Sequence, residues 1–290
     1  MEVRNIQKTG DMHYLYLPTS WCREHKIGHK SKISIEQNSD GSLIISPHIV
    51  ERRPKHLKLS IAEDDQDVIH KLVVACYINP ISSFEINLEK EMDFTKLLNQ
   101  KRLISLESIE IDKKQITCNG SISTSDPESL LKTMAKKIKN MIIVMQNSYN
   151  KELIGRYEDE IDRSKMLIDK SIISSFTFER TTRLKTIDLY YVSLISKDLE
   201  RMVDHLICLS STETEFLRLI YGVIEQFQDI IGNTDNLNHK TALQFIKKVS
   251  SIKGFEVKAV KSYDKERIRL SLITIAEVIT DWAITRDIEK

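Results

Sequence analysis

The sequence predicts a multidomain α+β protein with a small β domain first, an α/β unit in the middle and a helical bundle at the end. Three observations predict this class. Short apolar runs separated by Gly turns fill residues 1–50, strand and helix patterns alternate over residues 55–124, and apolar residues recur near every 3.6 positions from residue 125 onward. A chain of 290 residues has room for these domains.

Charge and cysteine usage limit the class of protein. The formal net charge is +1, but residues 1–60 hold ten Lys or Arg against six Asp or Glu, whereas residues 61–128 hold seven against thirteen. A basic N-terminus is compatible with nucleic-acid contact. No apolar run is long enough to span a bilayer, so we expect no membrane insertion. The cysteines are far apart and form no C-x-x-C pair, which indicates reduced thiols in a cytoplasmic protein: Cys22, Cys76, Cys118 and Cys208.

The first 50 residues predict a ββαββ unit. Two short strands flank the Gly10-Asp11 turn, a short helix follows Pro18, and two further strands flank the turn at residues 38–41. The predicted elements are residues 3–9, 12–17, 21–26, 32–37 and 42–46. A unit of this size buries too little apolar surface to be stable alone, so we expect it to pair with a second copy as a homodimer.

This unit resembles the AbrB/MazE/SpoVT swapped-hairpin domain. The resemblance rests on the element order, the Leu17-Pro18 step into a short helix and the hairpin Asp40-Gly41-Ser42-Leu43. It implies dimerisation by interleaved strands and binding of double-stranded DNA through basic residues on one face. By position, the cations expected at the phosphate backbone are Arg4, Lys8, Arg23, Lys26 and Lys30. The alternative is an ordinary solvated surface, because acidic residues interleave with these cations: Glu2, Asp11, Glu24 and Glu36.

Residues 55–124 predict a small α/β domain in which a mixed sheet is covered by two helices. The pattern reads βαβαββ over residues 56–61, 64–77, 83–88, 94–103, 107–112 and 115–122. It contains no Gly-rich phosphate loop and no nucleophile elbow. Asp64, Asp65 and Asp67 are explained more simply as acids at a helix start than as a cation site. The acidic balance of this segment indicates that it does not face DNA.

The C-terminal part predicts a bundle built from one helical unit used twice, over about residues 125–210 and 211–290. Its six helices are expected at residues 127–149, 151–176, 187–209, 213–231, 238–252 and 266–290. Glu200 and Asp204 are four residues apart and project from one face of the third helix, and Glu277 and Asp281 repeat this spacing in the sixth. The third helix carries one apolar stripe: Leu189, Val192, Ile195, Leu199, Met202, Val203 and Leu206.

The stretch Leu199-Glu200-Arg201-Met202-Val203-Asp204-His205 resembles the signature of PhoU, the phosphate-uptake regulator. The resemblance implies two three-helix repeats, each with an E-x-x-x-D motif that binds a metal cluster. Asp159 and Asp162, three residues apart on the preceding helix, are expected to face the first motif. The corresponding helix of the second repeat carries Lys247 and Lys248 and no matching acids, so the Glu277/Asp281 pair is expected to be structural or a weak site.

The expected cofactor is a divalent metal or an iron cluster. Oxygen ligands suit Mg, Ca or Mn, a contribution from His205 also admits iron, and Zn stays among the candidates. The alternative is a surface acid patch without metal, balanced by Arg156, Arg163 and Arg180.

The combination of an AbrB-like and a PhoU-like part resembles archaeal phosphate-uptake regulators. It implies a DNA-binding transcriptional regulator of phosphate uptake whose bundle senses phosphate status or a partner. The rival hypothesis is an adaptor that regulates a phosphate transporter or sensor kinase by protein contact without binding DNA. No H-E-x-x-H motif or Ser/Cys/His arrangement is readable, so an enzyme, such as a metal-dependent hydrolase in the bundle, is the less favoured class.

Overall fold

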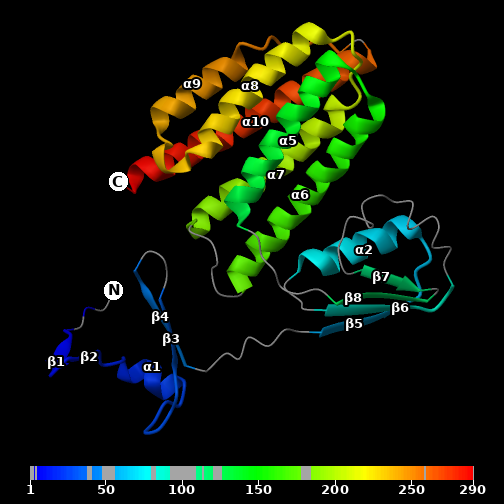
Figure 1. Ribbon diagram of the computed structural model, residues 1–290. Helices are drawn as coiled ribbons and strands as arrows, with labels where there is room; N and C mark the ends of the chain where they lie inside the picture. Colours follow the sequence, from blue (N-terminus) through cyan, green and yellow to red (C-terminus); the bar gives the residue numbers. More distant parts are fainter. Residues whose placement is uncertain are drawn as a thin grey trace. The chain divides into compact units, whose positions relative to one another are not determined.

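The protein has a mixed α+β fold with small sheets in its N-terminal half and helices in its C-terminal half, as a computed structural model shows (Figure 1). The structure describes residues 3, 5–37, 41–47, 56–79, 83–91, 109–112, 114–119, 126–177, 184–257 and 259–289. The chain divides into two compact units, Met1–Arg53 and Pro54–Lys290. The predicted fold class is therefore confirmed at the level of α+β, with a C-terminal helical region.

The first unit contains two separate antiparallel hairpins around a short helix. Strands β1 (Gln7–Thr9) and β2 (Met12–Tyr14) form one, and β3 (Ser34–Gln37) and β4 (Leu43–Ser46) form the other, with α1 (Thr19–Glu24) between them. Gly10 turns the first hairpin at φ +61°, a left-handed conformation that costs glycine little. The elements follow the predicted ββαββ order, but β1 and β2 are shorter than predicted.

The second unit begins with a four-stranded mixed sheet. Its strands are β5 (His56–Ile61), β6 (Ser83–Leu88), β7 (Ile109–Asp112) and β8 (Gln115–Asn119), in the order β5-β6-β8-β7. Strand β5 is parallel to β6, and the other two pairs are antiparallel. A mixed sheet is what the sequence predicted. The second helix predicted to cover it, at residues 94–103, lies outside the described residues.

Helix α2 (Gln66–Ile78) packs on this sheet and begins as the acids at its start predict. The Asp65 carboxylate accepts hydrogen bonds from the backbone N–H groups of Asp67 and Val68, and Asp64 pairs with Lys90 at 2.6 Å. These acids therefore lie at a helix start, as predicted, and Asp65 is the capping residue. Across the β5–β6 pair, Lys58 lies 2.6 Å from Glu85 and, with Asn87, lowers the pKa of that carboxyl to about 2.

The sheet unit and the bundle share a core. Ile69, Val73 and Cys76 of α2 pack against Phe84 and other apolar side chains of the sheet, and Met166 of a bundle helix joins the same cluster. The Nζ atom of Lys170, one turn further along that bundle helix, lies 3.9 Å from the centroid of the Tyr77 ring in α2. These contacts explain why residues from Pro54 onward form one compact unit.

The bundle contains six helices in two sets of three (Figure 1). The helices are α5 (Pro127–Asn147), α6 (Lys151–Thr177), α7 (Thr186–Leu206), α8 (Thr214–Gly232), α9 (His239–Ser250) and α10 (Val260–Ile288). A short 3₁₀ helix, η1 (Thr234–Asn236), links α8 and α9. Corresponding helices of the two sets pack against each other, α5 on α8 and α7 on α10. Within the described residues, no helix combines the length and apolar character needed to cross a membrane.

Helix α7 packs against α5, α6 and α10, and its predicted core stripe is confirmed. All seven apolar positions named above are at most 1% exposed. The prediction for α10 was wrong at its start, because the helix begins at Val260 and not near residue 266. The Ser262 hydroxyl accepts a hydrogen bond from the Ala259 N–H, which caps the extra turn, and Asp264 in that turn is buried.

Helices α7 and α10 are joined at one end by a buried carboxylate. Asp188, in the first turn of α7, is 1% exposed. Its Oδ1 atom accepts a 2.6 Å hydrogen bond from the Trp282 indole N–H, and Oδ2 accepts bonds from the Arg286 guanidinium and from the Lys185 backbone N–H. One side chain therefore caps α7 and anchors the last turns of α10.

A second contact joins the same two helices at their other end. The Nδ1 atom of His205, in the last turn of α7, lies 2.9 Å from Oδ1 of Asp264, near the start of α10. At the Asp188 end, Tyr191 and Thr285 also hydrogen-bond through their hydroxyl groups at 2.8 Å. The helices are therefore antiparallel and joined near both ends of α7.

We predict that Asp188→Ala lowers the free energy of unfolding by about 3–5 kcal/mol, because it leaves the buried Trp282 N–H and the partly buried Arg286 guanidinium without their acceptor. Chemical denaturation monitored by circular dichroism measures the change. The control is Asp235→Ala, which removes an exposed carboxylate of η1 and should change stability by less than about 0.5 kcal/mol. Equal stabilities of the two variants would contradict the anchoring role of Asp188.

Candidate functional site

Three carboxylates from two neighbouring bundle helices meet at one place. Asp162 lies on α6, and Glu200 and Asp204 lie on α7. One oxygen from each lies within 4.8 Å of the others. Asp162 is 7% exposed, Glu200 is half-buried and Asp204 is exposed, so the group runs from the interior to the surface. We call these three residues the acidic cluster.

The sequence predicted this meeting, because the four-residue spacing places Glu200 and Asp204 on one face of α7. Asp159, the fourth predicted member, is half-buried one turn before Asp162 and is not among the three clustered residues. His205 is not among them either, since its Nδ1 atom is directed to Asp264. The donor set that the structure brings together therefore contains only carboxylate oxygens.

Carboxylate oxygens at this separation are the ligands that hard divalent cations such as Mg²⁺, Mn²⁺ and Ca²⁺ accept in proteins. Three carboxylates also repel one another when charged, most strongly where one of them is buried as Asp162 is. A cation would offset that repulsion and leave coordination positions open to water. The residues thus fit a hard cation better than zinc in a thiolate or imidazole site.

The second carboxylate pair is placed differently. Glu277 and Asp281 are both exposed on α10, and no third Asp, Glu, His or Cys of the described residues joins them in a cluster. Helix α9, which corresponds to α6, has only 12 residues and carries Lys247 and Lys248 in its last turn. The equal spacing in the sequence therefore does not produce equal sites.

Cys208, close to Asp204 of the acidic cluster, is surrounded by carboxylates in a way that the sequence did not indicate. Burial raises the pKa of the Cys208 thiol, and the carboxylates of Asp264, Glu158 and Asp204 raise it further. Such a thiol is a poor nucleophile, because the thiolate is the reactive form. Asp264 comes from α10, 60 positions after Asp204, so no local spacing could have predicted that it lies near Cys208.

The predicted DNA-contacting cations lie on the first unit. Lys8 is on β1, Arg23 is on α1, and Lys26 and Lys30 lie in the loop after α1; Arg4 lies outside the described residues. The four described cations are exposed. None of them forms an ion pair with another residue that the structure describes, including the described acids Asp11 and Glu24.

Two of these lysines occupy left-handed backbone positions. Lys26 has φ +54° and directly follows the capping residue of α1, where the Ile27 N–H bonds the Cys22 carbonyl and the Lys26 N–H bonds the Arg23 carbonyl. Lys30 has φ +77° at the third position of a turn that the Ser31 N–H closes onto the Gly28 carbonyl. Both positions normally favour Gly or Asn.

Comparisons of the chain with protein-family models, with curated proteins and with solved structures found no match. The resemblances to PhoU and to the swapped-hairpin domain therefore stay predictions. Functional interpretation rests on the acidic cluster of the bundle and on the exposed side chains of the first unit.

Proposed function

We propose that the protein is a DNA-binding transcriptional regulator of phosphate uptake, in which the first unit dimerises and grips the duplex and the bundle holds a divalent cation at the acidic cluster. The observation that carries the proposal is the placement of Lys26 and Lys30 at positions where glycine would be less strained. The link to phosphate rests on the resemblance of the 199–205 stretch to PhoU.

The backbone conformations of Lys26 and Lys30 cost free energy. A non-glycine residue in the left-handed region costs about 1 kcal/mol or more relative to glycine. Two such costs in one short loop, at Lys26 and Lys30, are consistent with a requirement for the charge of the side chains. Strained positions of this kind concentrate at binding sites. Closely spaced lysines are suited to bind the phosphate oxygens of a nucleic acid, because each such contact releases counterions that were condensed on the nucleic acid.

The side chains of the first unit are poorly buried in the single chain, which supports a dimer. Every described side chain from residue 3 to residue 47 whose burial is assigned is at least partly exposed. Apolar and aromatic side chains are among the exposed ones: Val3, Ile6, Met12, Tyr14, Leu15, Tyr16, Ile35, Leu43 and Ile44. Isolated two-stranded hairpins are marginal in water, and their open edges pair readily with other strands. A second copy of the same unit offers both the apolar surface and the strand edges.

In the bundle, Asp162, Glu200 and Asp204 would hold the cation, which would supply positive charge to the cluster. The contacts that Asp188 and His205 make with α10 hold α7, the helix that carries Glu200 and Asp204. For the cation or a partner to change DNA affinity, it must bind two states of the protein with different affinities. The rival adaptor function remains an outcome of the tests below: dimerisation without DNA binding would favour it.

We predict that the protein binds duplex DNA from the promoters of phosphate-transport genes with an affinity that falls linearly on a log–log salt plot. Lys26→Gly/Lys30→Gly should weaken binding and reduce the slope by about 2 per chain, while thermal stability is unchanged or higher because the strain is relieved. Fluorescence anisotropy and thermal denaturation measure the two effects.

Two variants control this experiment. Lys26→Arg/Lys30→Arg keeps both charges and should keep the affinity, whereas Lys240→Gln/Lys253→Gln removes two exposed charges from the bundle and should leave DNA binding unchanged. If the glycine variant bound DNA as tightly as the wild type, the two lysines would not contact phosphates.

We predict that the protein sediments as a dimer and that Leu43→Lys dissociates it. Leu43 is 61% exposed in the single chain, so the substitution should be harmless unless a partner covers this side chain. A dimer contains two copies of Leu43, and burial of each leucine side chain contributes about 1.5–3 kcal/mol. Loss of both contributions should raise the dissociation constant of the dimer at least about 100-fold. Analytical ultracentrifugation measures it, with Leu243→Lys, 48% exposed on α9, as the matched control. A monomeric wild type would refute the dimer.

We predict that the protein binds Mn²⁺ at the acidic cluster and that Glu200→Gln/Asp204→Asn abolishes this binding, because two of three oxygen ligands lose their charge. Titration calorimetry and elemental analysis measure the stoichiometry. Glu277→Gln/Asp281→Asn makes the same change at the same spacing on α10 and should retain metal. Equal retention by both variants would place the ion elsewhere, and metal-free wild type would remove the cation from the proposal.

A further inference from the structure

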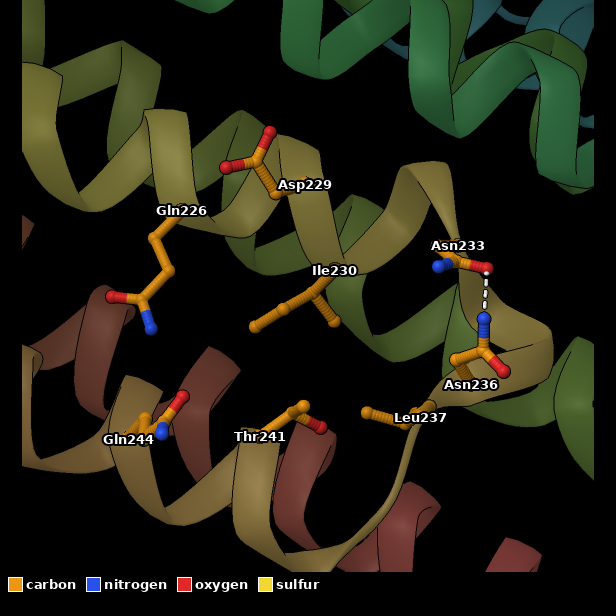
Figure 2. Close-up of a pocket in the computed structure, with 8 residues that line it drawn as sticks. All are labelled: Gln226, Asp229, Ile230, Asn233, Asn236, Leu237, Thr241 and Gln244. Carbon is orange, nitrogen blue, oxygen red and sulfur yellow. Dashed lines mark hydrogen bonds between the residues drawn. The ribbon is translucent and has the colours of Figure 1, made fainter.

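A pocket between α8 and α9, away from the acidic cluster, has an unusual lining. It has a volume of about 210 Å³ and lies where η1 connects the two helices. Four of its eight lining residues are carboxamides, and the others are one acid, one threonine and two aliphatic residues (Figure 2): Gln226, Asn233, Asn236, Gln244, Asp229, Thr241, Ile230 and Leu237. The lining contains no Lys, Arg or His.

The carboxamides are arranged at the two ends of the pocket. Figure 2 shows Gln226 reaching from α8 toward Gln244 on α9 at one end, and Asn233 and Asn236 together at the other. Within the described part of the chain, the side chains of Gln226 and Gln244 make no hydrogen bond. Asn236 donates to Oδ1 of Asn233 at 2.9 Å, which leaves the Asn233 amide N–H groups and the Asn236 Oδ1 acceptor for another molecule.

The centre of the pocket is apolar. Ile230 and Leu237 are 9% and 2% exposed and lie between the two carboxamide ends (Figure 2). Thr241 contributes little hydrogen-bonding capacity, because its hydroxyl already donates to the Asn238 carbonyl and accepts from the Asn238 N–H. The pocket therefore presents donors and acceptors at both ends and a hydrocarbon surface in the middle.

This chemistry selects one class of ligand. An anion such as a phosphate ester would find no cation in the lining to balance its charge. A cation would have only that one carboxylate, which points away from α9 in Figure 2. A carboxamide offers a donor and an acceptor on one planar group, which matches hydroxyl groups that each donate and accept. Aliphatic side chains match the C–H face of a ring.

We propose that the pocket between α8 and α9 binds a neutral polyhydroxylated molecule, a monosaccharide or cyclic polyol. Its volume lies below the range of about 300–1,000 Å³ that holds drug-sized ligands, so the ligand is no larger than one ring. Because the available contacts are neutral hydrogen bonds, the expected dissociation constants are about millimolar. The site is independent of DNA and metal binding.

The test uses the full chain with ribose, glucose and myo-inositol as probes, measured by saturation-transfer NMR and titration. We expect at least one probe to bind, and Gln226→Ala/Gln244→Ala to weaken its affinity by about tenfold or more, because two hydrogen-bonding groups are lost. The matched control is Gln228→Ala, which lies on α8 outside the pocket lining and should leave the affinity unchanged. Glucose 6-phosphate should bind more weakly than glucose.

Three outcomes would overturn the proposal. The first is no binding of any probe at up to about 100 mM, far above a millimolar dissociation constant. The second is equal affinity in the glutamine double variant and in Gln228→Ala. The third is tighter binding of the phosphorylated sugar, which would require a cation that the lining lacks. The variants should fold, since neither glutamine side chain makes a structural hydrogen bond, and their melting temperatures verify this.

Discussion

The buried carboxylate of Asp188 is the interaction on which the arrangement of the bundle depends. It accepts the N–H groups of Trp282 and Arg286 and also caps its own helix, so it connects residues 94 and 98 positions away in the chain. A buried charge is costly unless its partners are in place, and here the partners come from α10, far along the chain. The two halves of the bundle are thereby held in one register.

That register also fixes the candidate site. Helix α7 carries Glu200 and Asp204 between its Asp188 end and its His205 end, and both ends are tied to α10. The helix that is anchored at both ends is therefore the one that carries the two carboxylates facing Asp162 on α6. Like charges that lie this close repel one another when ionised, and the contacts of α7 with α10 are among those that hold the helix in place.

The periodicity of apolar residues and the spacing of polar ones predicted those parts of the protein whose structure is determined by neighbours in the sequence. The apolar stripe of α7, the Asp65 cap and the alternation of β5 and β6 follow from neighbours a few positions apart. Contacts between distant residues were not predictable in this way. Nothing near Asp264 in the sequence indicates that it bonds His205 or that α10 begins at Val260. The left-handed φ angles of Lys26 and Lys30 could not be predicted from the sequence, because lysine, unlike Gly or Asn, does not indicate such a backbone conformation.

The two carboxylate pairs show why a motif alone does not define a site. Glu200/Asp204 and Glu277/Asp281 have the same spacing on corresponding helices, yet the first pair meets a buried Asp162 and the second is exposed. The difference lies in the neighbouring helix: α6 has 27 residues and presents an acid, whereas α9 has 12 residues and ends in lysines. The facing helix, more than the motif, decides where a cation can be held.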